Sequence, residues 1–253
     1  MYRELGPADH RRILGIEEPD VPDVLLLVGV FDVHNVLERR FTRYIENPRR
    51  LGNFPAWLGT SGRLKVGLCG AFGGPMAAMH AHTFLAAGTP AVIQLGWFGA
   101  LQPGMALGDI VVPSHAERQD GLSDWYLPKG ILADASPELS SAIAAGLRAR
   151  DIPVVEKPIF TTPALLAESR EVIADWSRHG WQGVDMETAA TFSVAKAVGA
   201  QRAAALVRMD DLVSEEDSIA DAWPRERVRF IRAREQQVAE VALEAIARLE
   251  PAR

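Results

Sequence analysis

Residues 66–113 decide the fold of this chain, and they read VGLCGAFGGPMAAMHAHTFLAAGTPAVIQLGWFGALQPGMALGDIVVP. Two apolar runs of strand length, at 64–69 and 91–95, enclose a segment that carries the signals of a helix. Gly73-Gly74-Pro75 suits its start, because a proline at the first helical position gives up no hydrogen bond. Gly88 suits its end, because glycine readily adopts the left-handed conformation that follows the last turn. The stretch therefore predicts a strand, a helix and a second strand.

Glycines follow the second strand at once. The chain continues as Gly96-Trp97-Phe98-Gly99, and further glycines stand at 104 and 108. A glycine directly after a buried strand allows the backbone to come close to a ligand. In open α/β sheets, ligands bind at the carboxyl ends of the strands. We therefore expect a binding site at the end of the 91–95 strand.

Strands and helices are expected to alternate along the rest of the chain, which predicts a three-layer α/β/α fold. The chain has no linker or repeat, so we expect one domain over residues 1–253, with residues 1–22 as an N-terminal surface arm. Apolar runs, proline and glycine signals and helical spacing place the remaining elements. The expected strands are 23–30, 154–160, 183–186 and 203–208; the expected helices are 33–46, 136–150, 163–178, 187–198 and 224–249; residues 49–62 are expected to be a loop.

Composition excludes several classes of function. The chain has 253 residues and a net charge of −6, without a basic run that would indicate a nucleic-acid partner. The N-terminus lacks an apolar signal segment and no run of 18 apolar residues occurs, so we expect a cytoplasmic protein without a membrane partner. The single cysteine, Cys69, is interpreted as a buried strand thiol. Neither the cysteine nor the histidines are spaced as metal ligands, and no cofactor is expected.

Three motifs in order resemble the nucleoside phosphorylase / nucleosidase superfamily, which includes uridine and purine nucleoside phosphorylases and methylthioadenosine-type nucleosidases. The first is GGP at 73–75, followed by GWFGALQPG at 96–104 and GDIVVP at 108–113. The second is VDMETAA at 184–190, and the third, weaker one is LVRMDD at 206–211. The resemblance extends from about residue 24 to residue 212. It implies a mixed sheet flanked by helices and an enzyme that breaks the N-glycosidic bond of a nucleoside.

The resemblance implies that Glu187 and Met186 bind the sugar. The motif's methionine and glutamate are both present. A carboxylate can accept hydrogen bonds from both ribose hydroxyls, and such charge-assisted bonds are strong. Without the motif, Glu187 would be interpreted as an acidic residue that stabilises a helix N-terminus. Asp185 remains either a site residue or a structural one.

The third motif implies that Asp210 donates a proton to the leaving base, as in the purine-cleaving members of the family. Met209 stands where the family has a serine, so Asp211 can take the role instead after a slip of one residue. Phe160, at the end of an expected strand, resembles the aromatic residue that stacks on the base. The alternative for Phe160 is a place in the core.

The acceptor side departs from the phosphorylases. Their G-D-P-x-R loop is replaced by GVFDVH at 29–34, and Gln94 and Trp97 stand where they have a phosphate-binding arginine and threonine. Losing paired cations weakens phosphate binding. In the nucleosidase branch, Asp32 and His34 align with two acidic residues, the second of which activates water. A histidine is a credible base for water, although His34 can equally be an exposed residue at the start of a helix.

We therefore favour hydrolysis of a nucleoside, and two alternatives remain. One is phosphorolysis with an anion site rebuilt from Arg208, Arg49 or Arg50. The other is a non-catalytic member that binds a nucleoside, with Trp97 and Phe98 filling the catalytic loop. The remaining expected substrate-binding residue is Gly96, beside Trp97. The base preference tilts towards purines through the Asp210 motif.

A homo-oligomer built from dimers, up to a hexamer, is expected from the resemblance. Members of the family complete each site with a residue of the neighbouring subunit. His10, 19 residues before Gly29, stands where the family's ribose-binding histidine of the neighbour is expected.

Overall fold

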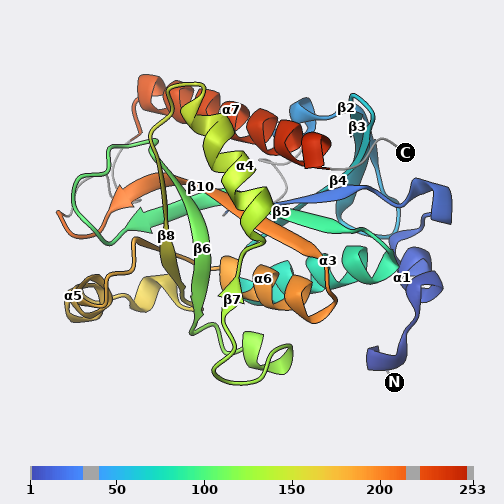
Figure 1. The fold of residues 1–253 in the computed structure, drawn as a ribbon, viewed down its shortest axis with the longest axis horizontal. Helices are drawn as coiled ribbons and strands as arrows, with labels where there is room; N and C mark the ends of the chain where they lie inside the picture. The colour runs from blue at the N-terminus through green and yellow to red at the C-terminus, as the bar shows by residue number, and fades with distance from the viewer. Residues whose placement is uncertain (1, 31–39, 215–222, 250–253) are drawn as a thin grey trace.

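The computed structural model describes residues 2–30, 40–214 and 223–249, and here ten strands form one mixed sheet between two helical layers (Figure 1). This confirms the expected three-layer α/β/α fold. One layer contains α4 (Pro137–Arg148) and α7 (Arg225–Leu249). The other layer contains α1 (Pro7–Leu14), α3 (Gly74–Ala87) and α6 (Thr188–Ala197). A further helix, α5 (Arg170–Arg178), lies beside the outer strands.

Strand β5 (Ala91–Ala100) is the centre of the sheet and pairs with strands on both sides. It is parallel to β1 (Val24–Gly29) on one side and to β10 (Gln201–Asp211) on the other. From β1 the sheet continues through a parallel pairing to β4 (Leu64–Ala71). Two antiparallel strands, β3 (Ala56–Ser61) and β2 (Glu46–Arg50), complete this half. All six residues of β1 are buried, as expected of a strand covered by helices on both faces.

The other half of the sheet closes on itself. Strand β10 pairs antiparallel with β6 (Ile110–Arg118), which pairs parallel with β8 (Val154–Thr161). The parallel neighbour of β8 is β9 (Gly183–Asp185), which returns antiparallel to the end of β5. A short strand, β7 (Ala133–Asp134), adds to β6. The closure brings the ends of β5, β9 and β10 together, and this positions the site described below.

The segment between β1 and β4 differs from the sequence-based expectation. Residues 31–39 lie outside the described part of the chain, so most of the expected 33–46 helix is not tested. The described remainder is a short 3₁₀ helix, η3 (Phe41–Tyr44), followed by β2. The expected loop at 49–62 is wrong, because β2 and β3 form a hairpin at the sheet edge. Ala56 and Leu58 of β3 alternate into the core, and this burial outweighs the glycines and prolines that suggested a loop.

Two further segments depart from the expected elements. The helix expected from residue 163 begins only at Arg170, where the Ser169 hydroxyl accepts a hydrogen bond from the Val172 N–H at 3.3 Å. A 3₁₀ turn, η5 (Leu165–Ala167), precedes it. Before β1, the range expected as a surface arm contains α1, whose buried Leu14 belongs to the same core cluster as several residues of α3.

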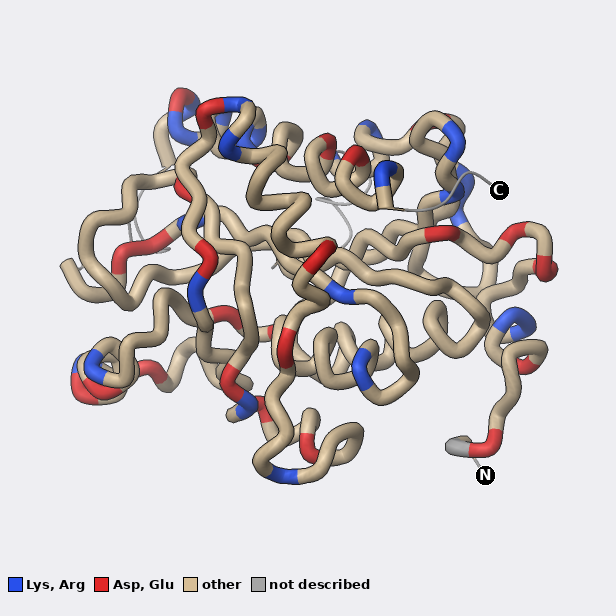
Figure 2. The backbone as a smooth tube through the Cα atoms, viewed as in Figure 1, with Lys and Arg blue, Asp and Glu red and all other residues tan. Residues whose placement is uncertain are grey.

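Charged residues of both signs are interspersed over the elements in Figure 2. No helix among the described residues is long and apolar enough to cross a membrane.

Candidate active site

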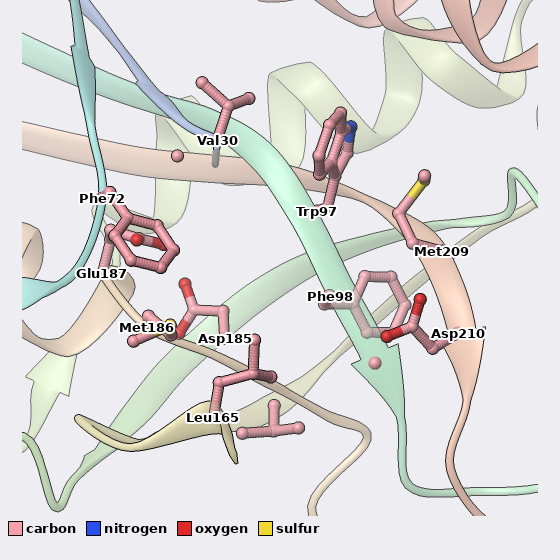
Figure 3. Close-up of a pocket in the computed structure, with 13 residues that line it drawn as sticks. Val30, Phe72, Trp97, Phe98, Leu165, Asp185, Met186, Glu187, Met209 and Asp210 are labelled. Atoms are coloured by element: carbon pink, nitrogen blue, oxygen red, sulfur yellow. The ribbon is translucent and has the colours of Figure 1, made fainter. Parts of the chain in front are cut away.

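A pocket of about 510 Å³, part of it open to solvent, lies at the carboxyl ends of β1, β5 and β10 (Figure 3). The β9 end and the start of α6 form one side, and Leu165 of η5 lies across from Val30. The lining residues are Gly29, Val30, Phe72, Trp97, Phe98, Gly99, Leu165, Val184, Asp185, Met186, Glu187, Met209 and Asp210.

Glu187 is buried at the start of α6, with 6 % of its surface exposed. One carboxylate oxygen accepts a hydrogen bond from the backbone N–H of Gly73 at 2.6 Å. The other lies so close to Gly29 that a Cβ there would sit 2.7 Å from it, so a side chain at this position would displace the Glu187 carboxylate. Burial and the negative charge of Asp185 raise the pKa of Glu187 to about 8. The hydrogen bond from Gly73 to Glu187 thus joins the GGP motif to the methionine–glutamate motif.

Asp185 organises the floor beneath Glu187. Its carboxylate accepts hydrogen bonds from the Thr161 hydroxyl at 2.7 Å, the Gln94 amide at 3.0 Å and the Thr188 N–H at 2.9 Å. Burial raises the pKa of Asp185. Gln94 is fully buried and also donates to the Thr188 hydroxyl at 2.9 Å. Gln94 therefore supports Asp185 and the start of α6 from below and is not a lining residue of the pocket.

A β-bulge places Asp210 in the pocket. In the register of β10 on β5, Arg208 pairs with Phe98 and Asp210 with Gly99, so Met209 is the extra residue. A bulge re-aims the side chains beside it, and here both Met209 and Asp210 line the pocket. Of the two neighbouring aspartates in the sequence, the structure brings Asp210 to the site.

Asp211 has a different surrounding. Its carboxylate accepts hydrogen bonds from the N–H groups of Val213 at 3.1 Å and Ser214 at 3.0 Å. It also forms an ion pair with Arg208 at 3.2 Å. These contacts lower the pKa of Asp211 against the effect of burial. Arg208 is buried and is not among the lining residues.

Glu168 lies close enough to Asp210 for their charges to interact, although nothing in the sequence singled it out. Burial and the charge of Asp210 raise the pKa of Glu168 to about 7. Within the described residues, its Oε1 atom is buried without a hydrogen-bond partner. A carboxyl group with a pKa near neutrality next to a second carboxylate is a typical proton donor.

Trp97 forms the wall next to Val30 and Met209 (Figure 3). Its indole N–H donates to Glu235 of α7 at 2.7 Å. The preceding Gly96 is required, because a Cβ there would lie 2.8 Å from the Gly29 carbonyl. Gly96 itself lines a separate small cavity together with Glu235.

Two more expected site residues, besides Gln94, Arg208 and Gly96, are not among the lining residues of the pocket. Phe160 stacks on Trp176 of α5 with ring centroids 4.2 Å apart, in a small cluster with Leu101 and Val184. His10 packs within its own chain, 5.3 Å from the ring of His82, and 5 % of its surface is exposed.

Asp32 and His34 lie outside the described residues, so the structure does not place them. The pocket therefore contains Glu187, Met186, Asp210 and Trp97 from the expected set. In the described part of the chain its charged lining residues are all acidic, namely Asp185, Glu187 and Asp210. No group of His, Cys, Asp and Glu side chains among the described residues is arranged to hold a metal ion.

Comparison with known proteins agrees with the fold and the motifs. A uridine phosphorylase structure from Vibrio fischeri superimposes with a TM-score of 0.79, at 22 % identity over 92 % of this chain and 95 % of that one. A guanosine phosphorylase from Halorubrum lacusprofundi is 28 % identical over 59 % of this chain. The match spans 62 % of the length of that relative. A DeoD-type purine nucleoside phosphorylase from Proteus mirabilis is 24 % identical over 74 % of this chain and 80 % of its own length.

The fold is thus that of a nucleoside phosphorylase, with a pocket at the expected strand ends. The model of the phosphorylase superfamily matches residues 25–248, and this chain belongs to that superfamily.

Proposed function

We propose that this protein cleaves the N-glycosidic bond of a nucleoside, with phosphate as the acceptor. The observation that carries the proposal is the pocket itself, which places Glu187 and Asp210 on opposite sides of one cavity (Figure 3). The relatives reported above are all phosphorylases by name, and this favours phosphate over the water that the sequence alone favoured.

The sugar would bind beside Glu187 and Met186. The Glu187 carboxylate is held by the Gly73 N–H, so the sugar hydroxyls find a fixed acceptor. A prepositioned group of this kind does not have to reorganise as positive charge develops at the anomeric carbon.

The base would lie towards Asp210 and Glu168. As the bond from the anomeric carbon to the base nitrogen breaks, its electron pair stays with the base, which then needs a proton. Two neighbouring carboxyl groups hold a proton between them more firmly than either alone. The raised pKa of Glu168, caused by burial and Asp210, supports this pair as the donor. An acceptor oxygen bonds to the anomeric carbon from the other side.

Hydrolysis is the second candidate, and one observation favours it. The lining residues of the pocket in the described part of the chain include three carboxylates and no cation. A phosphate dianion would need positive charge from elsewhere, such as Arg49 or Arg50 on the exposed edge strand β2 of a neighbouring subunit. Water needs only a base and a small space.

A panel of purine and pyrimidine nucleosides, incubated with and without phosphate, tests the proposal. We expect base release, with purine nucleosides turned over faster than pyrimidine ones because of Asp210. Base release that needs phosphate supports phosphorolysis, and base release without it supports hydrolysis. Binding without turnover of any nucleoside would contradict both and would support a non-catalytic protein.

A further inference from the structure

Glu235 is a charged residue in an apolar position. Helix α7 buries a stripe of side chains against the sheet, and this stripe includes Ile231, Val238 and Ala242. Glu235 lies in the same stripe with 4 % of its surface exposed. It lines a small cavity whose other walls include Phe41 and Val207. Burying a carboxylate among apolar groups is costly, and an apolar residue of similar volume usually serves stability as well or better. A role other than stability is therefore indicated.

Both carboxylate oxygens of Glu235 have a partner. One accepts the Trp97 indole N–H at 2.7 Å. The other accepts a hydrogen bond from the guanidinium of Arg40, just before η3. The Arg40 guanidinium also lies 6.0 Å from the centre of the Trp97 ring system and 5.9 Å from that of Phe41, within the range of cation–π contacts. Trp97 thus donates a hydrogen bond to Glu235 through its indole nitrogen, and its ring system forms a cation–π contact with Arg40.

Trp97 is the member of this group that faces the pocket. In Figure 3 the indole stands between Val30 and Met209, with its nitrogen on the side of the ring away from Glu187. The residue before it, Gly96, pairs with Gly29, which is in direct contact with Glu187. Trp97 therefore directly follows the residue that pairs with Gly29, beside the Glu187 carboxylate. Glu187 and Asp210 account for the sugar and base sides, and among the other lining side chains Trp97 is held by a buried ion pair, so its wall is assigned to the acceptor.

We infer that Glu235 is a positioning residue that fixes the Trp97 indole at the acceptor side of the pocket and so determines whether phosphate or water attacks the sugar. This inference rests on the proposed cleavage of a nucleoside. A fixed indole leaves one defined space for the acceptor and keeps other solvent out. A released indole enlarges that space and lets the other acceptor compete.

The test compares Glu235→Leu, Trp97→Phe and the double variant with the wild-type protein. Leucine suits the apolar cavity and removes the acceptor of the indole N–H, and phenylalanine keeps a ring without an N–H. The readouts are the ratio of sugar phosphate to free sugar at fixed phosphate, and KM for the nucleoside. Glu240→Leu is the matched control, because Glu240 also lies on α7 and also pairs with an arginine, Arg150, at 3.0 Å.

In both single variants we expect the product ratio to change at least tenfold, with KM for the nucleoside within about threefold of wild type. Free sugar should increase if the wild type uses phosphate, and sugar phosphate should increase if it uses water. The double variant should match Trp97→Phe alone, because Glu235 acts through the indole N–H. Glu240→Leu should leave the ratio unchanged. An unchanged ratio in Glu235→Leu, additive effects in the double variant, or an equal rise in KM for the nucleoside would overturn the inference.

Two further measurements keep the result decisive. If Glu235→Leu does not fold, Glu235→Gln replaces it, because glutamine keeps an acceptor for the indole but presents an amide donor to Arg40. The ratio of sugar phosphate to free sugar should then change less in Glu235→Gln than in Trp97→Phe. An equally large change would count against the role of the indole N–H. The second measurement is the fluorescence of Trp97, obtained as the emission spectrum of a protein with Trp97 minus that of the same protein carrying Trp97→Phe. The emission maximum of this difference spectrum should shift to the red when Glu235 is replaced. If the emission does not shift, Glu235 does not hold Trp97, and this conclusion stands whether or not the wild type releases base. If the wild type releases no base, the proposed function and the acceptor role of Trp97 are both refuted.

Discussion

Replacing Glu187 by glutamine should abolish most of the activity and leave the fold intact. The side chain of glutamine has nearly the same shape, so the Gly73 N–H can still donate to an oxygen at the position where it now finds Glu187 Oε1 at 2.6 Å. What changes is the charge and one of the two acceptors offered to the sugar. The substitution therefore separates substrate binding from folding.

The expected magnitude follows from these contacts. A hydrogen bond to a charged group is worth about 1.5–3 kcal/mol. Losing one such bond to a ribose hydroxyl lowers kcat/KM by roughly 10- to 10²-fold and losing two lowers it by roughly 10²-fold or more, since about 1.4 kcal/mol corresponds to a factor of ten. Exchanging the charge-assisted bond to Gly73 for a neutral one costs on the order of 1 kcal/mol, which is about 2–4 °C in Tm for a chain of this size.

The assay is base release under subsaturating nucleoside, together with a thermal melt of the same sample, at about pH 9, where Glu187, with its pKa of about 8, is mostly ionised. Glu240→Gln is the control, because it makes the same chemical change on α7, where the carboxylate pairs with Arg150 instead of lining the pocket. We expect full activity in the control. Turnover of Glu187→Gln close to that of the wild type would refute the assignment of Glu187 to the sugar.

Three further predictions concern the base side, the pH dependence and the assembly. Asp210→Asn should slow purine nucleosides by about 10²-fold or more, as expected for a general acid, but a nitrophenyl riboside much less; equal losses on both substrates would count against Asp210 as the donor. The free energy of unfolding should fall as pH rises from about 6.5 to 8.5, because the raised pKa values of Glu187 (about 8) and Glu168 (about 7) mean that the folded chain holds protons already lost by the unfolded one; below this window the lowered pKa values of His10, His80 and His82 act in the opposite direction. Urea titrations should give a shallower fall for Glu187→Gln, and an identical fall would show that Glu187 does not titrate in this way. Sedimentation at micromolar concentration should show a homo-oligomer, because Phe72 lines the pocket and is still 42 % exposed beside the exposed Met76 and Met79; a fully active monomer would refute this.

Local sequence signals were sufficient for the central elements of the fold. The helix from Gly74 to Ala87 begins and ends where proline and glycine indicate, because these residues act on the backbone beside them. The apolar runs that predicted β1, β4 and β5 are buried on both faces of the sheet. The strands β2 and β3, of which β2 is the edge strand, were missed because their pairing depends on distant contacts as well as on local pattern.

The site was predictable where a motif carried it and unpredictable where packing decides. Glu187 and Asp210 were found from motifs, but the choice between Asp210 and Asp211 needed the bulge at Met209. Phe160 looked like a base-stacking residue, and its partner, Trp176, could not be known from spacing.

Glu235 had a usable signal, since its spacing from Ile231 and Val238 places it on the apolar face of α7. Its contact with Trp97 joins residues 138 positions apart in the chain, which no local pattern indicates.

The most direct test of nucleoside cleavage is to identify the sugar product formed from a purine nucleoside in the presence of phosphate. We expect free base and ribose 1-phosphate in equal amounts, with base release stopping when phosphate is removed. If base and free ribose form in equal amounts instead, the acceptor is water and not phosphate. Failure to release base from any nucleoside, with or without phosphate, would contradict the proposed function.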